Sequence, residues 1–353
     1  GVREAAVTLG YLPDAIVDFF GDGAAWGLNM RYYTERTPLG TAGGVRQARD
    51  FLDETFCVLS GDGVTDLDLS EALRFHREHA ALVTMVLTRV ADPQEYGLVV
   101  TSQDGRVRSF LEKPGPGEVV SDTINTGIYI LEPEALSLIP DGRPCDFGGE
   151  LFPQMVAQGL NVFGCVLDGY WCDIGDVSAY LRCHADLLEG KLGLEVDTGV
   201  QPGALVDEDA QIASPCYIGA GARVERGARV GQYAVIGAGA VVESLADVKR
   251  SVLWKGARIG REAQARGCVL ASNARMEARA QASEADMERY FQNCPRVSMR
   301  LHRNPEQEGD DANDYAEAAI NGHVFLIRRG VTVEAPAPLY LLFKQAGERF
   351  DVE

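Results

Sequence analysis

The chain has 353 residues, of which 46% are apolar and 24% are charged, a balance typical of a globular protein with two or three domains. Its net charge of −19 argues against binding nucleic acid or an anionic membrane through the overall field, and leaves room for a local basic pocket. No apolar run reaches the roughly 18 to 20 residues of a membrane span, and no signal-peptide pattern is present. Eight cysteines without a CxxC pair or zinc-ligand spacing predict free thiols, and we expect a cytoplasmic protein.

Residues 1–190 alternate strand-like apolar runs with amphipathic helical stretches, the pattern of an α/β sheet flanked by helices. The first residues resemble the end of a helix entering a strand, which predicts a missing upstream element. His76 and His79 lie three apart on a predicted helix, and without a third ligand we interpret them as exposed helix residues rather than metal ligands. The expected strands are 5–9, 56–60 and 82–87, and the expected helices are 13–20 and 69–79.

From about residue 200 an apolar residue recurs every six positions. A period of six fits neither a helix nor a single strand, and it predicts short strands joined by tight corners, with glycines such as Gly221 and Gly239 at the corners. We therefore expect a left-handed parallel β-helix of hexapeptide repeats over 200–282. The recurring residues are Val206, Ile212, Ile218, Val224, Val230, Ile236, Val242 and Val248, and then Leu253 and Ile259, which resume one residue out of phase.

Residues 283–353 form a tail of a different composition. The first half, 283–313, is polar and acidic and is predicted to be partly disordered. A hairpin is expected from His323–Ile327 with Val331–Glu334, followed by a short helix at 339–346. The sequence thus predicts a polar linker and a small α+β tail of uncertain origin.

Six short motifs follow one another along residues 1–190. Glycines in the first would let a base and ribose lie close to the backbone, and a strand ending at Asp62 would place a carboxylate where a sheet binds Mg²⁺ and phosphates. Alone, each has an ordinary structural explanation, such as a turn before a helix or an aspartate capping a loop. The motifs are Leu39-Gly40-Thr41-Ala42-Gly43, Ser60-Gly61-Asp62, Tyr96-Gly97, Glu112-Lys113-Pro114, Asn125-Thr126-Gly127-Ile128-Tyr129 and Trp171-Cys172-Asp173-Ile174-Gly175.

In this order the motifs resemble those of the sugar-1-phosphate nucleotidyltransferase family, in particular the mannose-1-phosphate guanylyltransferase branch. The resemblance implies a Rossmann-like nucleotidyltransferase domain over 1–190. It implies that Asp62 and Asp173 hold Mg²⁺, that Lys113 contacts the sugar phosphate and that Glu112 accepts sugar hydroxyls. Asp62, Lys113 and Asp173 would be the catalytic residues. The remaining substrate-binding residues that it implies are Glu35, Gly40, Thr41, Gly97, Asn125 and Gly127.

The implied reaction joins a nucleoside triphosphate and a hexose 1-phosphate into a nucleotide sugar, releasing pyrophosphate. GTP and mannose 1-phosphate are favoured, because the first motif together with a C-terminal β-helix is most similar to that branch. The Glu35 carboxylate would accept N–H donors of guanine, and equally of uracil. The alternative is a non-catalytic regulatory or assembly subunit that binds nucleotide sugars. A β-helix acyltransferase is disfavoured because the coils lack a histidine, and a homo-oligomer is plausible.

The sequence departs from the family at both ends. The family's opening strand, its G-x-G-T-R-L loop and its P-K-P lysine have no counterpart among these residues. Without them the triphosphate would lose its nest of backbone N–H groups, so we expect impaired turnover, and two strands would keep unpaired edges. Residues 283–353 match no known continuation of the family, which suggests a truncated or joined reading frame.

Overall fold

The computed structural model describes residues 2–10, 12–90, 93, 96–111, 121–283, 296–301, 315–320, 323–328, 332–336 and 350–352. The chain divides into two compact units, Gly1–Trp171 and Cys172–Glu353. No helix in these ranges is long and apolar enough to cross a membrane.

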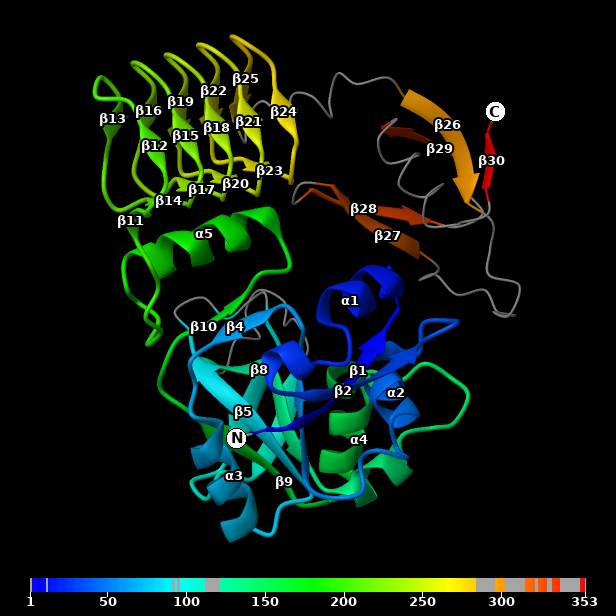
Figure 1. The fold of residues 1–353 in the computed structure, drawn as a ribbon. Helices are drawn as coiled ribbons and strands as arrows, with labels where there is room; N and C mark the ends of the chain where they lie inside the picture. Colours follow the sequence, from blue (N-terminus) through cyan, green and yellow to red (C-terminus); the bar gives the residue numbers. More distant parts are fainter. Residues whose placement is uncertain are drawn as a thin grey trace. The chain divides into compact units, whose positions relative to one another are not determined.

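The first unit is built on a six-stranded mixed sheet (Figure 1). Strand β5 is central, pairing antiparallel with β8 and parallel with β9, and six of its seven residues are buried. Strands β6 and β7 extend the sheet beyond β8, and β3 also pairs with β8. The strands are β3 (Phe56–Leu59), β5 (Val83–Arg89), β6 (Leu98–Thr101), β7 (Val107–Leu111), β8 (Thr123–Leu131) and β9 (Val162–Val166).

Successive residues of β5 point to opposite sides of the sheet, and residues on both sides are buried. Helices therefore cover both faces of this sheet. Met85 packs into the core beneath α2 (Gly40–Gln47) and α4 (Phe152–Ala157). Val86 packs into a second core beneath α3 (Leu69–Glu78). The predicted α/β sheet flanked by helices is confirmed. The 3₁₀ turn η2 (Pro133–Leu138) and the π turn η3 (Phe147–Leu151) complete the first of these layers.

The prediction that His76 is an exposed helix residue is wrong. Its side chain is fully buried, with Nδ1 2.8 Å from Thr84 Oγ1 and Nε2 3.0 Å from Glu132 Oε1. Helix α3 turns the positions of Ala72 and His76, one turn apart, towards the sheet, so the histidine belongs to the packed face. His79 is half-buried and stacks on Phe75 at 4.0 Å between ring centroids.

Strands β1 (Glu4–Leu9) and β2 (Asn29–Thr34) form a separate parallel pair. Within the described residues, β1 pairs with β2 alone and β3 with β8 alone, so each keeps one unpaired edge. Leu59, at the end of β3, leaves 54% of its surface exposed. Unpaired, partly apolar edges of this kind are a liability for aggregation.

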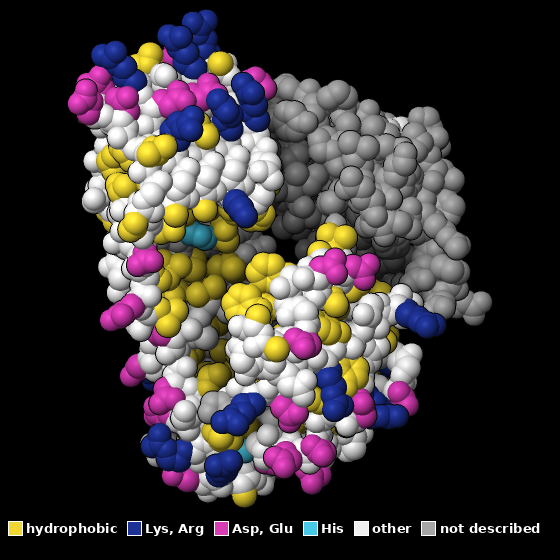
Figure 2. Space-filling model, viewed as in Figure 1, with side chains coloured by type: hydrophobic (Ala, Val, Ile, Leu, Met, Phe, Trp, Pro, Cys, Tyr) yellow, Lys and Arg dark blue, Asp and Glu magenta, His cyan; other side chains and the backbone are white. Residues whose placement is uncertain are grey.

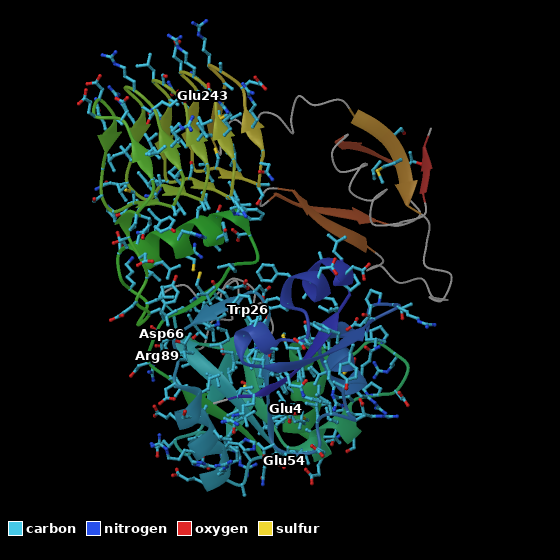
Figure 3. All side chains as sticks on the ribbon, in the orientation of Figure 1. Glu4, Trp26, Glu54, Asp66, Arg89 and Glu243 are labelled. Atoms are coloured by element: carbon cyan, nitrogen blue, oxygen red, sulfur yellow. The ribbon has the colours of Figure 1, made fainter. Side chains whose placement is uncertain are left out.

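An aromatic cluster lies at the surface of the same unit. It joins helix α1 (Pro13–Phe20) to the 3₁₀ turn η1 (Ala24–Trp26). The ring centroid of Trp26 lies 5.9 Å from that of Phe19 and 5.6 Å from that of Phe20. Phe19 is 68% exposed and Trp26 is 55% exposed. Figure 2 shows apolar side chains at the surface over α1, and Figure 3 labels Trp26.

The second unit contains the predicted β-helix. Fifteen short strands form three parallel five-stranded sheets, and the inward residues that recur every six positions make the core; Ile218, Ile236 and Ile259 are fully buried. This confirms the left-handed β-helix. The strands are β11 (Gly199–Val200), β12 (Leu205–Val206), β13 (Gln211–Ile212), β14 (Tyr217–Ile218), β15 (Arg223–Val224), β16 (Arg229–Val230), β17 (Val235–Ile236), β18 (Val241–Val242), β19 (Asp247–Lys249), β20 (Val252–Leu253), β21 (Arg258–Ile259), β22 (Gln264–Arg266), β23 (Val269–Leu270), β24 (Arg275–Met276) and β25 (Gln281–Ser283).

The phase shift in the repeat comes from a change in coil length. Val230 pairs with Val248, 18 residues on, whereas Val248 pairs with Ala265, 17 residues on. The residue is lost at the corner after β19, where the hydroxyl of buried Ser251 donates to Lys249 O at 2.9 Å and accepts Cys268 N–H at 3.1 Å. The Ser251 side chain therefore closes the corner that is one residue shorter.

Helix α5 (Val177–Leu188) packs against the sheet that runs from β11 to β23. Trp254 Nε1 donates to Tyr180 Oη at 3.0 Å, and Tyr233 Oη donates to Glu189 just beyond the helix. Asp176 caps the helix by accepting Ala179 N–H at 2.7 Å. The helix thus covers one of the three outer faces of the β-helix.

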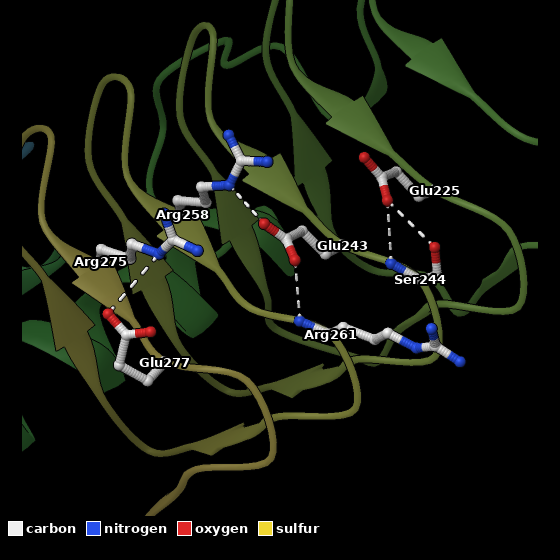
Figure 4. Close-up of polar contacts among 7 residues, drawn as sticks. All are labelled: Glu225, Glu243, Ser244, Arg258, Arg261, Arg275 and Glu277. Carbon is white, nitrogen blue, oxygen red and sulfur yellow. Dashed lines mark hydrogen bonds and ion pairs between the residues drawn. The ribbon is translucent and has the colours of Figure 1, made fainter.

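Carboxylates tie successive coils together along the sheet from β12 to β24 (Figure 4). Glu225 accepts the backbone N–H and the hydroxyl of Ser244, each at 3.1 Å, and Glu243 accepts Arg261 N–H at 3.0 Å and the Arg258 guanidinium. The Arg258 hydrogen bond, with the help of Arg261 N–H, holds the pKa of Glu243 below its ordinary value of 4.5. Each carboxylate links one coil to the next.

The described part of the tail is all strand. The predicted hairpin of His323–Ile327 with Val331–Glu334 is wrong: β28 (His323–Arg328) pairs with β27 (Tyr315–Ile320). Asn321-Gly322, which separates these strands in the sequence, is a strong hairpin signal. β26 (Arg296–Leu301) pairs with β29 (Thr332–Pro336) and β30 (Phe350–Val352), and the predicted helix at 339–346 lies outside the described residues.

The Glu243 contacts predict a pH-dependent contribution to stability. Because its folded-state pKa is depressed, its stabilisation is present above about pH 4.5 and is lost as the pH falls through the folded pKa. We expect Glu243→Gln to lower the free energy of unfolding by roughly 0.5–1 kcal/mol at pH 7, with the gap to the parent narrowing towards pH 3. Urea unfolding at several pH values measures this. The control is Glu277→Gln, because the Glu277 side chain is 78% exposed and its ion pair with Arg275 is 3.7 Å long; this variant should hardly change the free energy of unfolding. An effect of Glu243→Gln that does not depend on pH would contradict the stabilising role given to the Glu243 carboxylate.

Candidate functional site

A cavity of about 470 Å³ opens in the first unit beside the end of β3. The residues that line it come from β1, from α2, from the turn after β3, from β8 and from the segment before α4. Segments far apart in the sequence therefore meet here, as at the carboxyl ends of strands in other α/β sheets. The lining residues are Thr8, Thr41, Val45, Val58, Leu59, Ser60, Gly61, Asn125, Gly127, Tyr129, Asp146, Phe147, Gly148 and Gly149.

The glycine-rich motif forms the first turns of α2, where a turn before a helix was expected. The carboxylate of Glu35, just after β2, accepts Leu39 N–H at 3.0 Å and fixes the entry to the helix. A Cβ at Gly44 would lie 2.4 Å from Glu35 Oε1, so a larger residue there would push this carboxylate aside. In this structure Glu35 supports α2 rather than lining the cavity.

Gly40 lets the start of α2 approach the backbone of Cys145. Its φ is +71°, and an added Cβ would lie 2.6 Å from Cys145 O. That carbonyl accepts Ala42 N–H at 3.0 Å and Gly43 N–H at 3.1 Å. The first-turn N–H groups of α2 are thus satisfied by a chain segment about a hundred residues away, which fixes one wall of the cavity.

Thr41 and Asp146 bind each other across this contact. Asp146 Oδ1 accepts Thr41 N–H at 2.9 Å and the Thr41 hydroxyl at 3.1 Å, and Thr41 Oγ1 accepts Phe147 N–H at 3.0 Å. Sequence reasoning missed Asp146, although an acidic residue followed by Phe147, Gly148 and Gly149 is a signal for a backbone that bends around a site. Its carboxylate is held at the wall of the cavity.

A bulge in β8 brings the asparagine motif to the cavity. The pairing with β5 shifts between Val86 and Leu87, which leaves Thr126 and Gly127 outside the regular ladder. Asn125 donates from Nδ2 to Tyr129 Oη at 2.8 Å and accepts Gly127 N–H at 3.2 Å. Its backbone N–H donates to Gly97 O at 2.8 Å, so Gly97 positions Asn125 from the neighbouring strand.

Asp62 lies in the turn after β3, and its side chain is exposed. The Ser60 hydroxyl donates to its Oδ1, and Ser60 N–H donates to Gly127 O at 3.2 Å, which ties the turn to the β8 bulge. The turn therefore holds this carboxylate one residue beyond the lining residue Gly61. Carboxylate oxygens are the donors that Mg²⁺ prefers, so the residue type fits the ion.

The last motif spans the boundary between the two units. Tyr170 N–H donates to Asp66 Oδ1 at 2.6 Å (Asp66 is labelled in Figure 3), and Trp171 Nε1 donates to Thr126 O at 3.0 Å. Trp171 begins β10 (Trp171–Asp173). Asp173, half-buried in the second unit, accepts Gly175 N–H at 2.8 Å.

Three of the ten predicted site residues, Thr41, Asn125 and Gly127, line one cavity. Glu112 and Lys113 lie outside the described residues. Across the described ranges, no group of three or more histidine, cysteine, aspartate or glutamate side chains is arranged to hold a metal ion.

No thiol of this wall is activated as a nucleophile. Cys145 is 2% exposed, and burial raises the pKa of its thiol above the ordinary value, with the negative charge of Glu150 adding to the effect. The thiol is therefore protonated at neutral pH, whereas a nucleophilic cysteine must be a thiolate.

Known proteins resemble both parts of the chain. Residues 1–190 match the family described as nucleotidyl transferase, and residues 201–294 match the GlmU-like C-terminal hexapeptide family. The chain is 37% identical over 244 residues to a UTP–glucose-1-phosphate uridylyltransferase of Synechocystis, with 62% of each chain covered. It is 35% identical over 229 residues to a mannose-1-phosphate guanylyltransferase of Mycobacterium tuberculosis (63% of each), and 37% over 231 residues to mannose-1-phosphate guanylyltransferase 1 of Arabidopsis thaliana (62% of this chain, 63% of that protein). The chain thus spans 62 to 63% of the length of these relatives.

The contact of Gly40 with Cys145 can be tested against a matched glycine. Gly142 has a φ of +72° and nothing within 4 Å of an added Cβ, so Gly142→Ala carries the conformational cost alone. We expect about 1 kcal/mol of destabilisation for Gly142→Ala and roughly 3 kcal/mol for Gly40→Ala, which adds the overlap with Cys145 O. Urea unfolding of both variants measures the difference; equal costs would show that the close approach contributes nothing.

Proposed function

Because this chain belongs to the nucleotidyl transferase family, we propose that it transfers a nucleotidyl group from a nucleoside triphosphate to a hexose 1-phosphate. The products are a nucleotide sugar and pyrophosphate. The observation that carries the proposal is the cavity, in which the glycine-rich start of α2 and the asparagine motif of β8 face each other beside the turn that holds Asp62.

The geometry supports this reaction because it separates two tasks. Thr41 and Val45 of α2 line one side of the cavity, where the base and ribose would lie. Asn125, fixed by Tyr129 and Gly97, offers an amide for hydroxyl groups of a sugar. Holding both substrates in one cavity supplies the orientation that an in-line transfer between two anions requires.

In the proposed reaction an oxygen of the sugar phosphate attacks the α-phosphorus of the nucleotide. A new phosphorus–oxygen bond forms as the bond to the β-phosphate breaks, and the β- and γ-phosphates leave together as pyrophosphate. Asp62 and Asp173 would hold Mg²⁺, which supplies charge neutralisation of the phosphates. Lys113 would contact the sugar phosphate and Glu112 the sugar hydroxyls, with no covalent intermediate on the protein.

GTP and mannose 1-phosphate are the substrates that we propose. Two of the relatives described above are named mannose-1-phosphate guanylyltransferases, and the choice of GTP rests on them, since Glu35 does not line the cavity. The relative from Synechocystis is named for UTP and glucose 1-phosphate, so this pair is the competing choice. The two bases differ in ring number and exocyclic donors, which a substrate panel resolves.

The test is pyrophosphate release by the purified protein with GTP, UTP, ATP or dTTP paired with mannose 1-phosphate or glucose 1-phosphate. We expect kcat/KM to be highest for GTP with mannose 1-phosphate. We expect Asp62→Asn to lower kcat/KM by about a hundredfold or more, because the carboxylate charge that faces the phosphates is removed. Asp53→Asn, at an exposed carboxylate after α2, is the matched control and should leave kcat/KM unchanged.

Each outcome bears on a different part of the proposal. A preference for UTP with glucose 1-phosphate would overturn the choice of substrates and keep the reaction. Binding of GDP-mannose without turnover of any pair would favour the alternative, a nucleotide-sugar-binding regulatory or assembly subunit. Equal losses in Asp62→Asn and Asp53→Asn would contradict the role given to Asp62.

A further inference from the structure

A basic groove lies on the outer face of the β-helix sheet that contains β13, β16, β19 and β22, and has a volume of about 720 Å³. Four cationic side chains, Arg229, Lys249, Arg250 and Arg266, are set among only one carboxylate, Asp247. All four are exposed, in a chain whose net charge is −19. The other lining residues are Gln211, Ile212, Ala213, Val230, Gly231 and Gly267.

The groove lies where the coil length changes. Its first part is formed by the 18-residue coils around Ala213 and Gly231, and its second part by the 17-residue coils around Lys249 and Gly267. The longer corner after β16 lies beside the shorter corner after β19. The hollow therefore follows from the same step that shifts the hydrophobic repeat.

Small residues keep the floor of the groove open. A Cβ at Gly231 would lie 3.1 Å from both Cβ and Cγ of Lys249, so a larger residue there would push the lysine aside. Ala213 holds the equivalent position on the preceding coil, since Ile212 pairs with Val230. The lysine stem thus lies directly over Gly231.

The four cations share one carboxylate within the groove, Asp247, which is also the register partner of Arg229. Lys249 and Arg266 are register partners on β19 and β22, where like charges destabilise a sheet. Asp247 binds Arg266 at 2.8 Å, and within the described residues neither Arg229 nor Lys249 forms an ion pair with a carboxylate. Arg250 Cζ lies 5.4 Å from the ring centroid of Tyr233, and the positive charge of Arg250 acts on the carboxylate of Glu189. A net positive charge remains, which an anion would neutralise.

We propose that the basic groove binds an anionic ligand that carries a chain of several phosphates, such as the phosphate chain of a nucleotide or a free oligophosphate. Arg229, Lys249 and Arg266 stand on three successive coils, and neighbouring strands are about 4.8 Å apart, so these cations extend over about 10 Å. One phosphate is too small to contact them all, whereas a chain of phosphates spans them. Guanidinium groups suit this ligand because they bind phosphate oxygens in pairs.

The groove is a site separate from the cavity of the first unit, and the proposal stands whether or not the chain has the activity proposed above. Its probe is inorganic tripolyphosphate, titrated calorimetrically into the whole protein at fixed ionic strength. We expect saturable binding that Arg229→Ala combined with Lys249→Ala weakens at least tenfold. Orthophosphate at the same ionic strength should bind at least tenfold more weakly than tripolyphosphate.

The matched control combines Arg223→Ala with Arg275→Ala. It removes the same charge from β15 and β24 on the adjacent face of the same coils, and should change tripolyphosphate affinity less than twofold. Equal weakening of tripolyphosphate binding in both double variants would show that only the overall charge of the protein matters, and would overturn the proposal. Unchanged affinity in the groove variant would place the binding elsewhere, and orthophosphate binding as tight as tripolyphosphate would overturn the ligand class. Because all four substituted residues are exposed, we expect the coils to remain folded in each variant. Thermal unfolding of each variant checks this.

Discussion

The cavity of the first unit depends on the close approach of two backbones, the start of α2 and the segment at Cys145. The carbonyl of Cys145 accepts two N–H groups from the first turn of α2, and Gly40 makes the approach sterically possible. Thr41 and Asp146 then reinforce the contact from their side chains. Because α2 and the segment before α4 cover the same face of the sheet, this contact sets the width of the space above the β8 bulge, and the placement of Asn125 and Gly127 follows from it.

In the second unit the corresponding constraint is the alignment of inward side chains in successive coils. Parallel pairing carries each buried aliphatic residue directly above its counterpart one coil earlier, so a residue lost at one corner must be lost again at the same corner of the next coil. Ser251 and Cys268 show how the tighter corner is closed by hydrogen bonds. The outer face at this corner carries the basic groove, so a constraint of the core determines where a surface feature can form.

Several features could be predicted because they depend on patterns local in the sequence. The six-residue repeat specified the β-helix, and alternation of strands and helices specified the α/β unit. Other predictions failed where partners were distant or ambiguous. His76 was expected at the surface, yet its contacts with Thr84 and Glu132 come from elements later in the chain. The tail hairpin was misplaced because His323–Arg328 had two possible neighbours in sequence, and strand pairing chose the one before it.

The amino-acid sequence by itself determined the two kinds of architecture and the order of the motifs, because hydrophobic period and glycine position act over a few residues. Only the tertiary structure decided which motif residues share a cavity. Thr41 lies more than eighty residues before Asn125 and Gly127, and it meets them through the α2 contact and a bulge that no local pattern predicted. Asp146 and the four cations of the basic groove became visible in the same way, since long-range packing and coil register are set by contacts between distant segments.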